Sequence, residues 1–311
     1  MATSPERPLK DAIALVAGAT RGAGRGIARA LGQAGATVYC SGRSSRAGRP
    51  EALPWPSEFA TEARPETIED TAEMVTALGG QGIAVRADHT DPAQVQALCA
   101  QIGQAHGGLD ILVNDIWGGD ALTEWGKPFW ELSLEKALAM QQRAVHTHLI
   151  TSRHAVPLML DAARREARPG LVLEITDGEG EAYRGNLAYD LAKSATIRLA
   201  HGMAAELRPH NVAAIALTPG FLRSEAMLEH FGVTEDNWRA GAEKDPHFAQ
   251  SESPAFIGRA VVALAADAGM MARSGGVFGT WRLARDYGFT DADGSRPDWG
   301  RYFESIREEP K

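Results

Sequence analysis

Short apolar runs alternate with longer segments of helical periodicity along the 311 residues of the chain. The runs are rich in Val, Ile, Leu and Ala on both faces, a pattern typical of parallel strands covered by helices on each side. They predict strands at Ala12–Ala17, Ala36–Ser41, Gly82–Ala87, Asp110–Asn114, Leu171–Thr176, Val212–Leu217 and Gly276–Thr280. The longer segments predict helices at Gly24–Ala34, Ile68–Leu78, Ala93–His106, Leu134–Asp161, Tyr189–Leu207 and Pro254–Ala266.

The alternation of strand and helix is unbroken, and this favours one domain over the two that the length alone allows. We predict a single doubly wound α/β Rossmann fold with a roughly seven-stranded parallel sheet, formed by residues 1–311 with its core at about 10–280. Three stretches exceed this core: a Pro- and Arg-rich insertion at 44–65, a substrate loop at 221–253 and a polar C-terminal tail at 281–311.

The composition argues against several classes of binding partner. The net charge is -8, which disfavours binding to nucleic acid and to anionic membranes. No apolar run approaches the ~18 residues of a membrane span, and the N-terminus lacks the apolar core of a signal peptide. The two cysteines, Cys40 and Cys99, fit a reducing compartment. We therefore expect a cytoplasmic protein that binds no nucleic acid, membrane or metal.

A glycine-rich turn follows the first predicted strand. Gly18, Gly22 and Gly24 are spaced G-x-x-x-G-x-G between that strand and the next helix. The first glycine permits a tight turn, and the others let backbone N–H groups approach a pyrophosphate at the helix N-terminus. The alternative is a plain strand–helix connection, because turns collect glycine for steric reasons.

Two arginines suggest which dinucleotide binds. An NAD site places a carboxylate near the end of the second strand to hold the ribose 2′-hydroxyl. Here Ser41, Gly42 and Arg43 stand at that point, and Arg21 lies in the glycine turn. Arginines attract a 2′-phosphate, so we predict NADP(H) in preference to NAD(H). The alternative is that both are solvated surface arginines.

Tyr189 and Lys193 lie four residues apart on one helical face, just after the fifth predicted strand. Parallel sheets bind ligands at this edge. An ammonium about 4 Å from a phenol contributes roughly 4 kcal/mol at an effective dielectric of ~20. That energy corresponds to about three pKa units, so we predict that the pKa of Tyr189 falls towards neutrality. Tyr189 would then act as an acid or base on a carbonyl or alcohol.

Together these motifs resemble the short-chain dehydrogenase/reductase family. AGATRGAGRGIA, ADHTD, DILVND, YDLAK and ALTPGFLRSE follow the order and spacing of that family over about residues 10–280. The resemblance implies that Tyr189 is the catalytic acid/base, with Lys193 as its partner and ribose ligand. It implies coenzyme contacts from Gly18, Thr20, Arg21, Gly22, Gly24, Arg43, Asp88, Asn114, Tyr189, Lys193, Pro219, Gly220, Leu222 and Ser224. It also implies a homodimer or homotetramer, formed through the helices at 134–161 and 189–207.

The chain departs from the family pattern at the catalytic serine, which marks it as a variant subgroup. Thr176 and Asp177 stand 13 and 12 residues before Tyr189, where the family carries its serine. Thr176 still offers a hydroxyl donor, whereas an ionised Asp177 facing the reacting oxygen would oppose a developing oxyanion. We therefore expect Thr176 to be the donor, with Asp177 turned away or orienting it. The alternative is that neither residue acts.

A second departure concerns the auxiliary asparagine of the family, whose expected position falls near Ala144. Gln141 and His148 share the face of Ala144, and either could substitute. A lone histidine on a helix is more often structural.

Aromatic residues gather in the two loops expected to flank the nicotinamide. The first loop contains Trp117, Trp125, Phe129 and Trp130. The second contains Phe221, Leu222, Met227, Leu228, Phe231 and Trp238. Such walls suit an apolar or aromatic carbonyl substrate. The alternative is a lid that packs on itself or on a partner subunit.

These inferences combine into an NADPH-dependent carbonyl reductase or alcohol dehydrogenase that acts on a small carbonyl or alcohol compound. One alternative is a catalytically impaired NADP(H)-binding protein with a regulatory or redox-sensing role. Another is a family member with different chemistry, such as an epimerase or a dehydratase.

Overall fold

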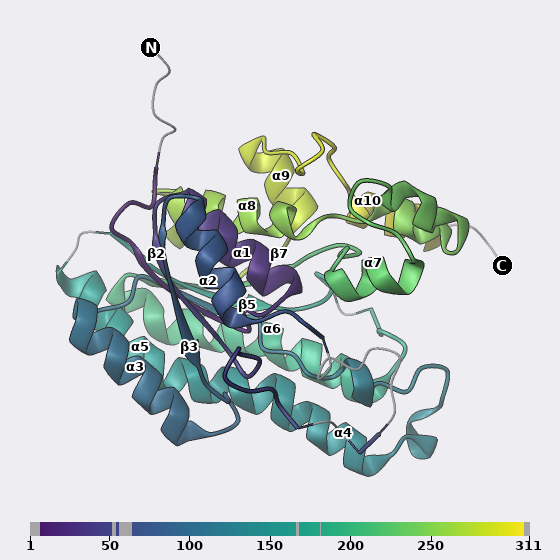
Figure 1. Cartoon of the computed structure of the whole chain (residues 1–311), viewed down its shortest axis with the longest axis horizontal. Helices are drawn as coiled ribbons and strands as arrows, with labels where there is room; N and C mark the ends of the chain where they lie inside the picture. The colour runs from purple at the N-terminus through teal and green to yellow at the C-terminus, as the bar shows by residue number, and fades with distance from the viewer. Residues whose placement is uncertain (1–6, 52–53, 56–63, 166–167, 181, 308–311) are drawn as a thin grey trace.

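Seven strands form one parallel sheet, as the sequence predicts. The computed structural model describes residues 7–51, 54–55, 64–165, 168–180 and 182–307 (Figure 1). The strands are β1 (Ile13–Ala17), β2 (Thr37–Gly42), β3 (Gln81–Arg86), β4 (Ile111–Asn114), β5 (Gly170–Ile175), β6 (Val212–Thr218) and β7 (Val277–Gly279). Their order is β3-β2-β1-β4-β5-β6-β7, so the strand order reverses between β1 and β4. This reversal is where such sheets bind ligands.

Helices cover both faces of the sheet (Figure 1). One layer contains α1 (Gly22–Gln33), α2 (Ile68–Ala77), α8 (Pro254–Ala266) and α9 (Thr280–Tyr287). The other contains α3 (Pro92–His106), α5 (Thr147–Arg165) and α6 (Leu187–Leu207). Side chains alternate along the strands, so Ala14 and Val16 pack in the first core and Leu15 packs in the second. This two-sided burial explains the continuous apolar runs.

The long helix predicted at 134–161 is interrupted by one wider turn. The segment forms α4 (Leu134–Gln141), a π-helical turn at Gln142–His146 and then α5. The turn contains Ala144, which is buried. Such π-turns occur frequently at functional sites.

The segment after β7 is folded rather than extended. Residues predicted as a polar tail form α9 and α10 (Trp299–Arg307). In α9, Trp281, Leu283 and Ala284 are buried, and the polar residues between them face solvent. The helical spacing of the few apolar residues, and not their number, decides the structure here.

The sheet edge at the carboxyl ends of the strands is partly covered by α7 (Glu225–Phe231) and α10, which lie near one another in Figure 1. Both contribute residues to the cleft described below. Within the described ranges, the structure contains no helix with the length and apolar character needed to cross a bilayer.

Candidate active site

A cleft of about 520 Å³ opens at the carboxyl edge of the sheet. Most residues implicated by sequence line it: Gly18, Thr20, Arg21, Gly22, Arg43, Asp88, Thr176, Asp177, Tyr189, Lys193, Pro219, Gly220, Leu222 and Ser224. Gly24 and Asn114, also implicated by sequence, are not among the lining residues. A volume of this size suits a cofactor or a drug-sized ligand.

In the glycine turn between β1 and α1, backbone segments approach one another too closely for a side chain to fit between them. Gly18 has a φ of +98°, and a Cβ there would lie 2.3 Å from the carbonyl oxygen of Asp115. A Cβ on Gly24 would lie 2.4 Å from the carbonyl oxygen of Gly18. Both positions therefore require glycine.

The backbone of this turn already holds an anion from the chain itself. The Gly22 N–H donates to Oε2 of Glu225, at 2.8 Å. The other oxygen of Glu225 lies 3.7 Å from Arg25 Nη1. A carboxylate therefore occupies the anion position at the N-terminus of α1. The turn thus fits the pyrophosphate of a dinucleotide, provided that Glu225 moves away.

Three arginines line the cleft, and we call this group the arginine end: Arg21, Arg43 and Arg143. Arg21 lies 3.6 Å from the Glu66 carboxylate, which Arg64 also binds. A Cβ on Gly118 would lie 3.5 Å from Arg143 and 3.7 Å from Arg43, so both side chains reach the loop after β4. Asp88 also lines the cleft here, and Thr90 donates to its carboxylate.

Tyr189 and Lys193 occupy the first turns of α6, where Asn186 caps the helix by accepting the Tyr189 N–H at 3.0 Å. The Tyr189 hydroxyl donates to Oδ2 of Asp177 at 2.9 Å. The Lys193 ammonium lies 4.0 Å from the centre of the Trp117 ring and 5.5 Å from that of Tyr189. Three carboxylates that line the cleft act on the Lys193 ammonium, and we call this group the carboxylate end: Asp115, Asp120 and Asp177.

The ionisation of the pair differs from the sequence prediction. Burial and the neighbouring Asp177 carboxylate raise the pKa of Tyr189 well above the ordinary value of a phenol. The predicted lowering by Lys193 is wrong, because the phenol touches a carboxylate while the ammonium lies over an indole ring. Burial lowers the pKa of Lys193, and the nearby carboxylates, with Asp177 foremost, partly offset that effect. Burial also raises the pKa of Asp115 to about 7.

The two candidates for the serine position have separate partners. The Thr176 hydroxyl is buried and donates to the backbone carbonyl of Lys193 at 2.8 Å. Asp177, and not Thr176, faces the Tyr189 hydroxyl. The structure therefore gives Thr176 a contact with α6 and places a carboxylate beside the phenol, the reverse of the expected arrangement.

The two candidates for the missing asparagine are both engaged away from Tyr189. Gln141 donates to the Ala188 carbonyl at 2.7 Å. His148 is buried, with Nδ1 2.5 Å from Glu174 Oε2 and Nε2 3.0 Å from the Ile116 carbonyl. Asn114 donates to the same Glu174, at 2.7 Å. These residues form a buried chain that braces β4, β5 and α5 behind the cleft.

The predicted aromatic walls are only partly assembled. Trp117 and Trp125 have ring centres 5.4 and 5.3 Å from that of Tyr189. Phe129 and Trp130 pack on each other at the surface instead. In the second loop, Phe221, Leu222 and Met227 line the cleft, whereas Phe231, Trp238 and Phe248 form a small core of their own. Part of these loops therefore lines the cleft, and part packs on itself.

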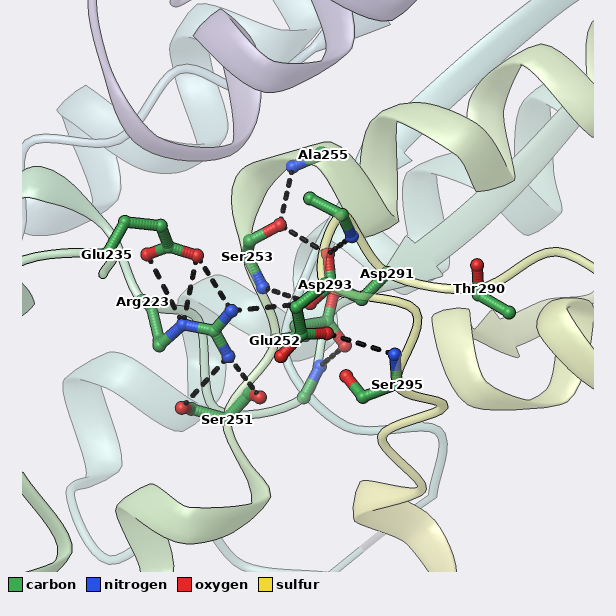
Figure 2. Close-up of polar contacts among 12 residues, drawn as sticks. Arg223, Glu235, Ser251, Glu252, Ser253, Ala255, Thr290, Asp291, Asp293 and Ser295 are labelled. Atoms are coloured by element: carbon green, nitrogen blue, oxygen red, sulfur yellow. Dashed lines mark hydrogen bonds and ion pairs between the residues drawn. The ribbon is translucent and has the colours of Figure 1, made fainter. Parts of the chain in front are cut away.

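A buried polar network anchors the substrate loop to the C-terminal segment (Figure 2). Arg223 is fully buried, stacks on the Trp238 ring at 3.9 Å and donates to Glu235 at 2.8 Å. It also lies 3.5 Å from Asp291, which accepts the Ser253 N–H at 2.8 Å. The loop is therefore held at both of its ends.

Glu252 extends this anchoring to the turn after β6. Its Oε2 accepts from the Gly220 N–H at 2.9 Å and from the Thr280 hydroxyl at 2.6 Å. Trp299 of α10 closes over the same turn, because a Cβ on Gly220 would lie 2.6 Å from the Trp299 Cβ. The C-terminal segment thus shapes the cleft directly.

Sequence reasoning missed several residues that line the cleft: His89, Asp115, Asp120, Arg143 and Trp299. Asp115 and Asp120 follow the fourth strand, so their place at a strand end was a usable signal. Trp299 has no such signal, since it lies beyond the last strand. Glu225 was equally hidden, because only the tertiary fold brings it to the glycine turn.

Comparison with known proteins agrees with this architecture. A family model described as short chain dehydrogenase matches residues 57–232. The mouse protein "Dehydrogenase/reductase SDR family member 1" is 33% identical over 292 residues, which cover 92% of this chain and 85% of that protein. The human protein of the same name is 31% identical over 297 residues, with the same coverage.

The chain belongs to the short-chain dehydrogenase/reductase family. A solved structure of a putative dehydrogenase from Xanthomonas campestris superposes with a TM-score of 0.71 at 25% identity, covering 93% of this chain and 94% of the other. The family is one of oxidoreductases that use nicotinamide cofactors, which is consistent with the glycine turn and the Tyr189–Lys193 pair on one cleft.

Proposed function

We propose that this short-chain dehydrogenase/reductase is an NADPH-dependent carbonyl reductase that acts on small carbonyl compounds. The observation that carries the proposal is that one cleft joins an anion-binding glycine turn and an arginine end to the Tyr189–Lys193 pair. Arginine binds phosphate in a bidentate manner, so Arg21 and Arg43 favour the 2′-phosphate of NADPH over the free hydroxyl of NADH.

Tyr189 and Lys193 have different roles in the proposed reduction. Bound NADPH would supply the hydride, which the carbonyl carbon accepts. The carbonyl oxygen takes the proton of the Tyr189 hydroxyl, so that an alcohol and NADP⁺ are the products, and the tyrosine regains a proton from solvent. The raised pKa of Tyr189 keeps the phenol protonated, so Tyr189 enters the reaction as the proton donor, but it also makes the phenol a weaker acid. Lys193 partly neutralises the nearby carboxylates and so reduces their opposition to the tyrosinate that forms.

The alternative is an NADP(H)-binding regulatory protein without turnover. One observation favours it: the Tyr189 hydroxyl is directed at Asp177, and the Thr176 hydroxyl is directed at the Lys193 carbonyl. Substrate-dependent consumption of NADPH separates the two functions, because a binding protein would retain the coenzyme without oxidising it. The same assay excludes an epimerase or dehydratase if the coenzyme is consumed in proportion to product.

The cofactor assignment is tested by titrating the protein with NADPH and with NADH. The chain has seven tryptophans, and Trp117 lines the cleft, so energy transfer to the reduced nicotinamide reports binding. We expect NADPH to bind at least about tenfold more tightly than NADH, the effect of one charge-assisted contact. Equal affinities would contradict the NADPH preference. Failure of both nucleotides to bind would contradict the enzyme and the regulatory protein together.

We further propose that the chain forms a homodimer or homotetramer through α4, α5 and α6. Exposed leucines lie on this face: Leu134, Leu138, Leu149 and Leu191. Light scattering of the wild type and of a Leu138→Glu variant tests this, because a charge in an apolar interface should dissociate the assembly. A wild-type monomer would contradict the proposal.

A further inference from the structure

The hydrogen bond between Tyr189 and Asp177 constrains which carbonyl compounds the proposed reductase can accept. Asp177 follows β5, is partly buried and lines the cleft. Its Oδ2 accepts the one proton that the Tyr189 hydroxyl carries, at 2.9 Å. An ionised carboxylate offers acceptors only. When Tyr189 turns its proton to a substrate oxygen, Asp177 therefore loses that hydrogen bond.

Within the described residues, Tyr189 is the side chain that donates to the Asp177 carboxylate, although the buried Arg184 Nη2 lies beside Gly178 without a hydrogen-bond partner. Arg184 approaches Asp177 through the backbone carbonyl, to which its Nε donates at 2.6 Å, and its Nη1 binds Asp190 at 2.7 Å. The Lys193 ammonium lies over the Trp117 ring. Asp177 lines the cleft, so a substrate bound beside Tyr189 displaces water from its carboxylate. A donor on the substrate can then take the place of the Tyr189 hydroxyl.

We infer that the site selects carbonyl compounds with a hydrogen-bond donor on the carbon next to the carbonyl, such as α-hydroxy or α-ammonio ketones. The inference rests on the proposed reductase function. The carbonyl oxygen accepts from Tyr189 while the adjacent hydroxyl or ammonium donates to Asp177. Heteroatoms on adjacent carbons are separated by about one hydrogen-bond length, which matches the 2.9 Å between the Tyr189 hydroxyl and Asp177.

A plain ketone lacks this match. Its carbonyl lone pairs approach a carboxylate whose own hydrogen bond has been broken, and both effects oppose binding. Asp177 is thus a specificity-determining residue in the place where the family carries a hydroxyl. A hydroxyl at this position can donate to any carbonyl substrate. Asp177 instead favours those carbonyl compounds that carry a donor on the adjacent carbon.

The test is a matched series of aromatic ketones: acetophenone, 2-methoxyacetophenone, 2-hydroxyacetophenone and 2-aminoacetophenone. The methoxy compound keeps an electron-withdrawing oxygen at the same carbon but has no donor. For the wild type we expect kcat/KM for NADPH oxidation to be at least about tenfold higher with the hydroxy ketone than with the methoxy ketone. A still larger value with the amino ketone would identify a charge-assisted contact.

Asp177→Ser supplies the second half of the test. Serine can donate to a plain carbonyl, so we expect the variant to gain activity on acetophenone and to lose most of the preference for the hydroxy ketone. A gain cannot arise from misfolding. Asp120→Ser is the matched control, because it removes a carboxylate from the same end of the cleft without touching the Tyr189 hydroxyl, and it should keep the preference.

Two outcomes would overturn the inference and are distinguishable. Similar wild-type rates on the hydroxy and methoxy ketones, or a preference that survives in Asp177→Ser, would overturn the selection by Asp177 and leave the reductase intact. A wild type that binds NADPH and reduces none of the four ketones would overturn the reductase function, and this inference with it.

Discussion

Two groups of opposite charge line the cleft, the arginine end and the carboxylate end, and Arg21 of the first group lies close enough to act on Asp120 of the second. The arginine end attracts phosphates, whereas the carboxylate end repels them and surrounds the Tyr189–Lys193 pair. The contrast is the basis for proposing that different groups of residues bind the coenzyme phosphate and the substrate, with Lys193 partly neutralising the carboxylate end.

The largest expected effect comes from removing that cation. Lys193→Met removes the ammonium that partly neutralises Asp177, Asp115 and Asp120, so the tyrosinate formed on proton donation becomes harder to reach. We expect kcat to fall by roughly 10² or more at saturating NADPH. Lys127→Met is the control, because Lys127 is exposed and pairs with Glu124 away from the cleft. A similar kcat in both variants would show that the opposing charges do not govern the reaction.

At the other end of the cleft, Arg43→Ala should weaken NADPH binding by roughly 10- to 100-fold, the effect of a lost charge-assisted contact to phosphate. NADH binding should stay unchanged, since NADH has no 2′-phosphate. Arg46→Ala serves as the control, because Arg46 pairs with Asp70 and Glu73 on α2. Equal losses for both nucleotides would place Arg43 outside the phosphate site.

Glu225 places a negative charge at the glycine turn, where the coenzyme pyrophosphate is proposed to bind. Glu225→Gln should tighten NADPH binding roughly 5- to 10-fold, because the pyrophosphate no longer has to displace a carboxylate from the Gly22 N–H. Glu229→Gln, on the same helix but paired with Arg64, should leave the affinity unaltered. Fluorescence titration measures both, and an unchanged or weaker affinity in Glu225→Gln would contradict the displacement.

The smallest effect concerns the acidity of Tyr189. The Asp177 carboxylate raises the pKa of Tyr189, so Asp177→Asn should lower that pKa and bring the alkaline loss of reductase activity to a lower pH. We expect a displacement of roughly half a pH unit or more in the profile of kcat/KM. A profile that moves to higher pH, or not at all, would show that the carboxylate does not control the proton on the phenol.

The fold was predictable because burial on both faces of the sheet leaves an unambiguous pattern in the strands. The glycine turn and the Tyr189–Lys193 pair were predictable for a related reason: each depends on a fixed local spacing. The C-terminal segment was harder to interpret, because only a few apolar residues, such as Trp281 and Leu283, decide that it packs as a helix. Local spacing predicts helices and turns, but it does not show which weakly amphipathic segments pack as helices.

The electrostatics of the site could not be read from spacing. The sequence showed that Lys193 lies one helical turn from Tyr189, but not that its ammonium would lie over Trp117. Likewise, Thr176 and Asp177 differ by one position, and the rotation of the chain after β5 alone determines which of them faces the phenol. Such outcomes depend on side-chain packing across several elements, which a linear pattern does not encode.

The central claim, proton donation by Tyr189 to a carbonyl reduced by NADPH, is tested most directly with Tyr189→Phe. The measurement is kcat for NADPH oxidation with 2-hydroxyacetophenone, alongside the Kd for NADPH by fluorescence titration. The account predicts a fall in kcat of roughly 10² or more with the Kd unchanged, because only the hydroxyl is removed. Equal turnover in the variant and the wild type would contradict it.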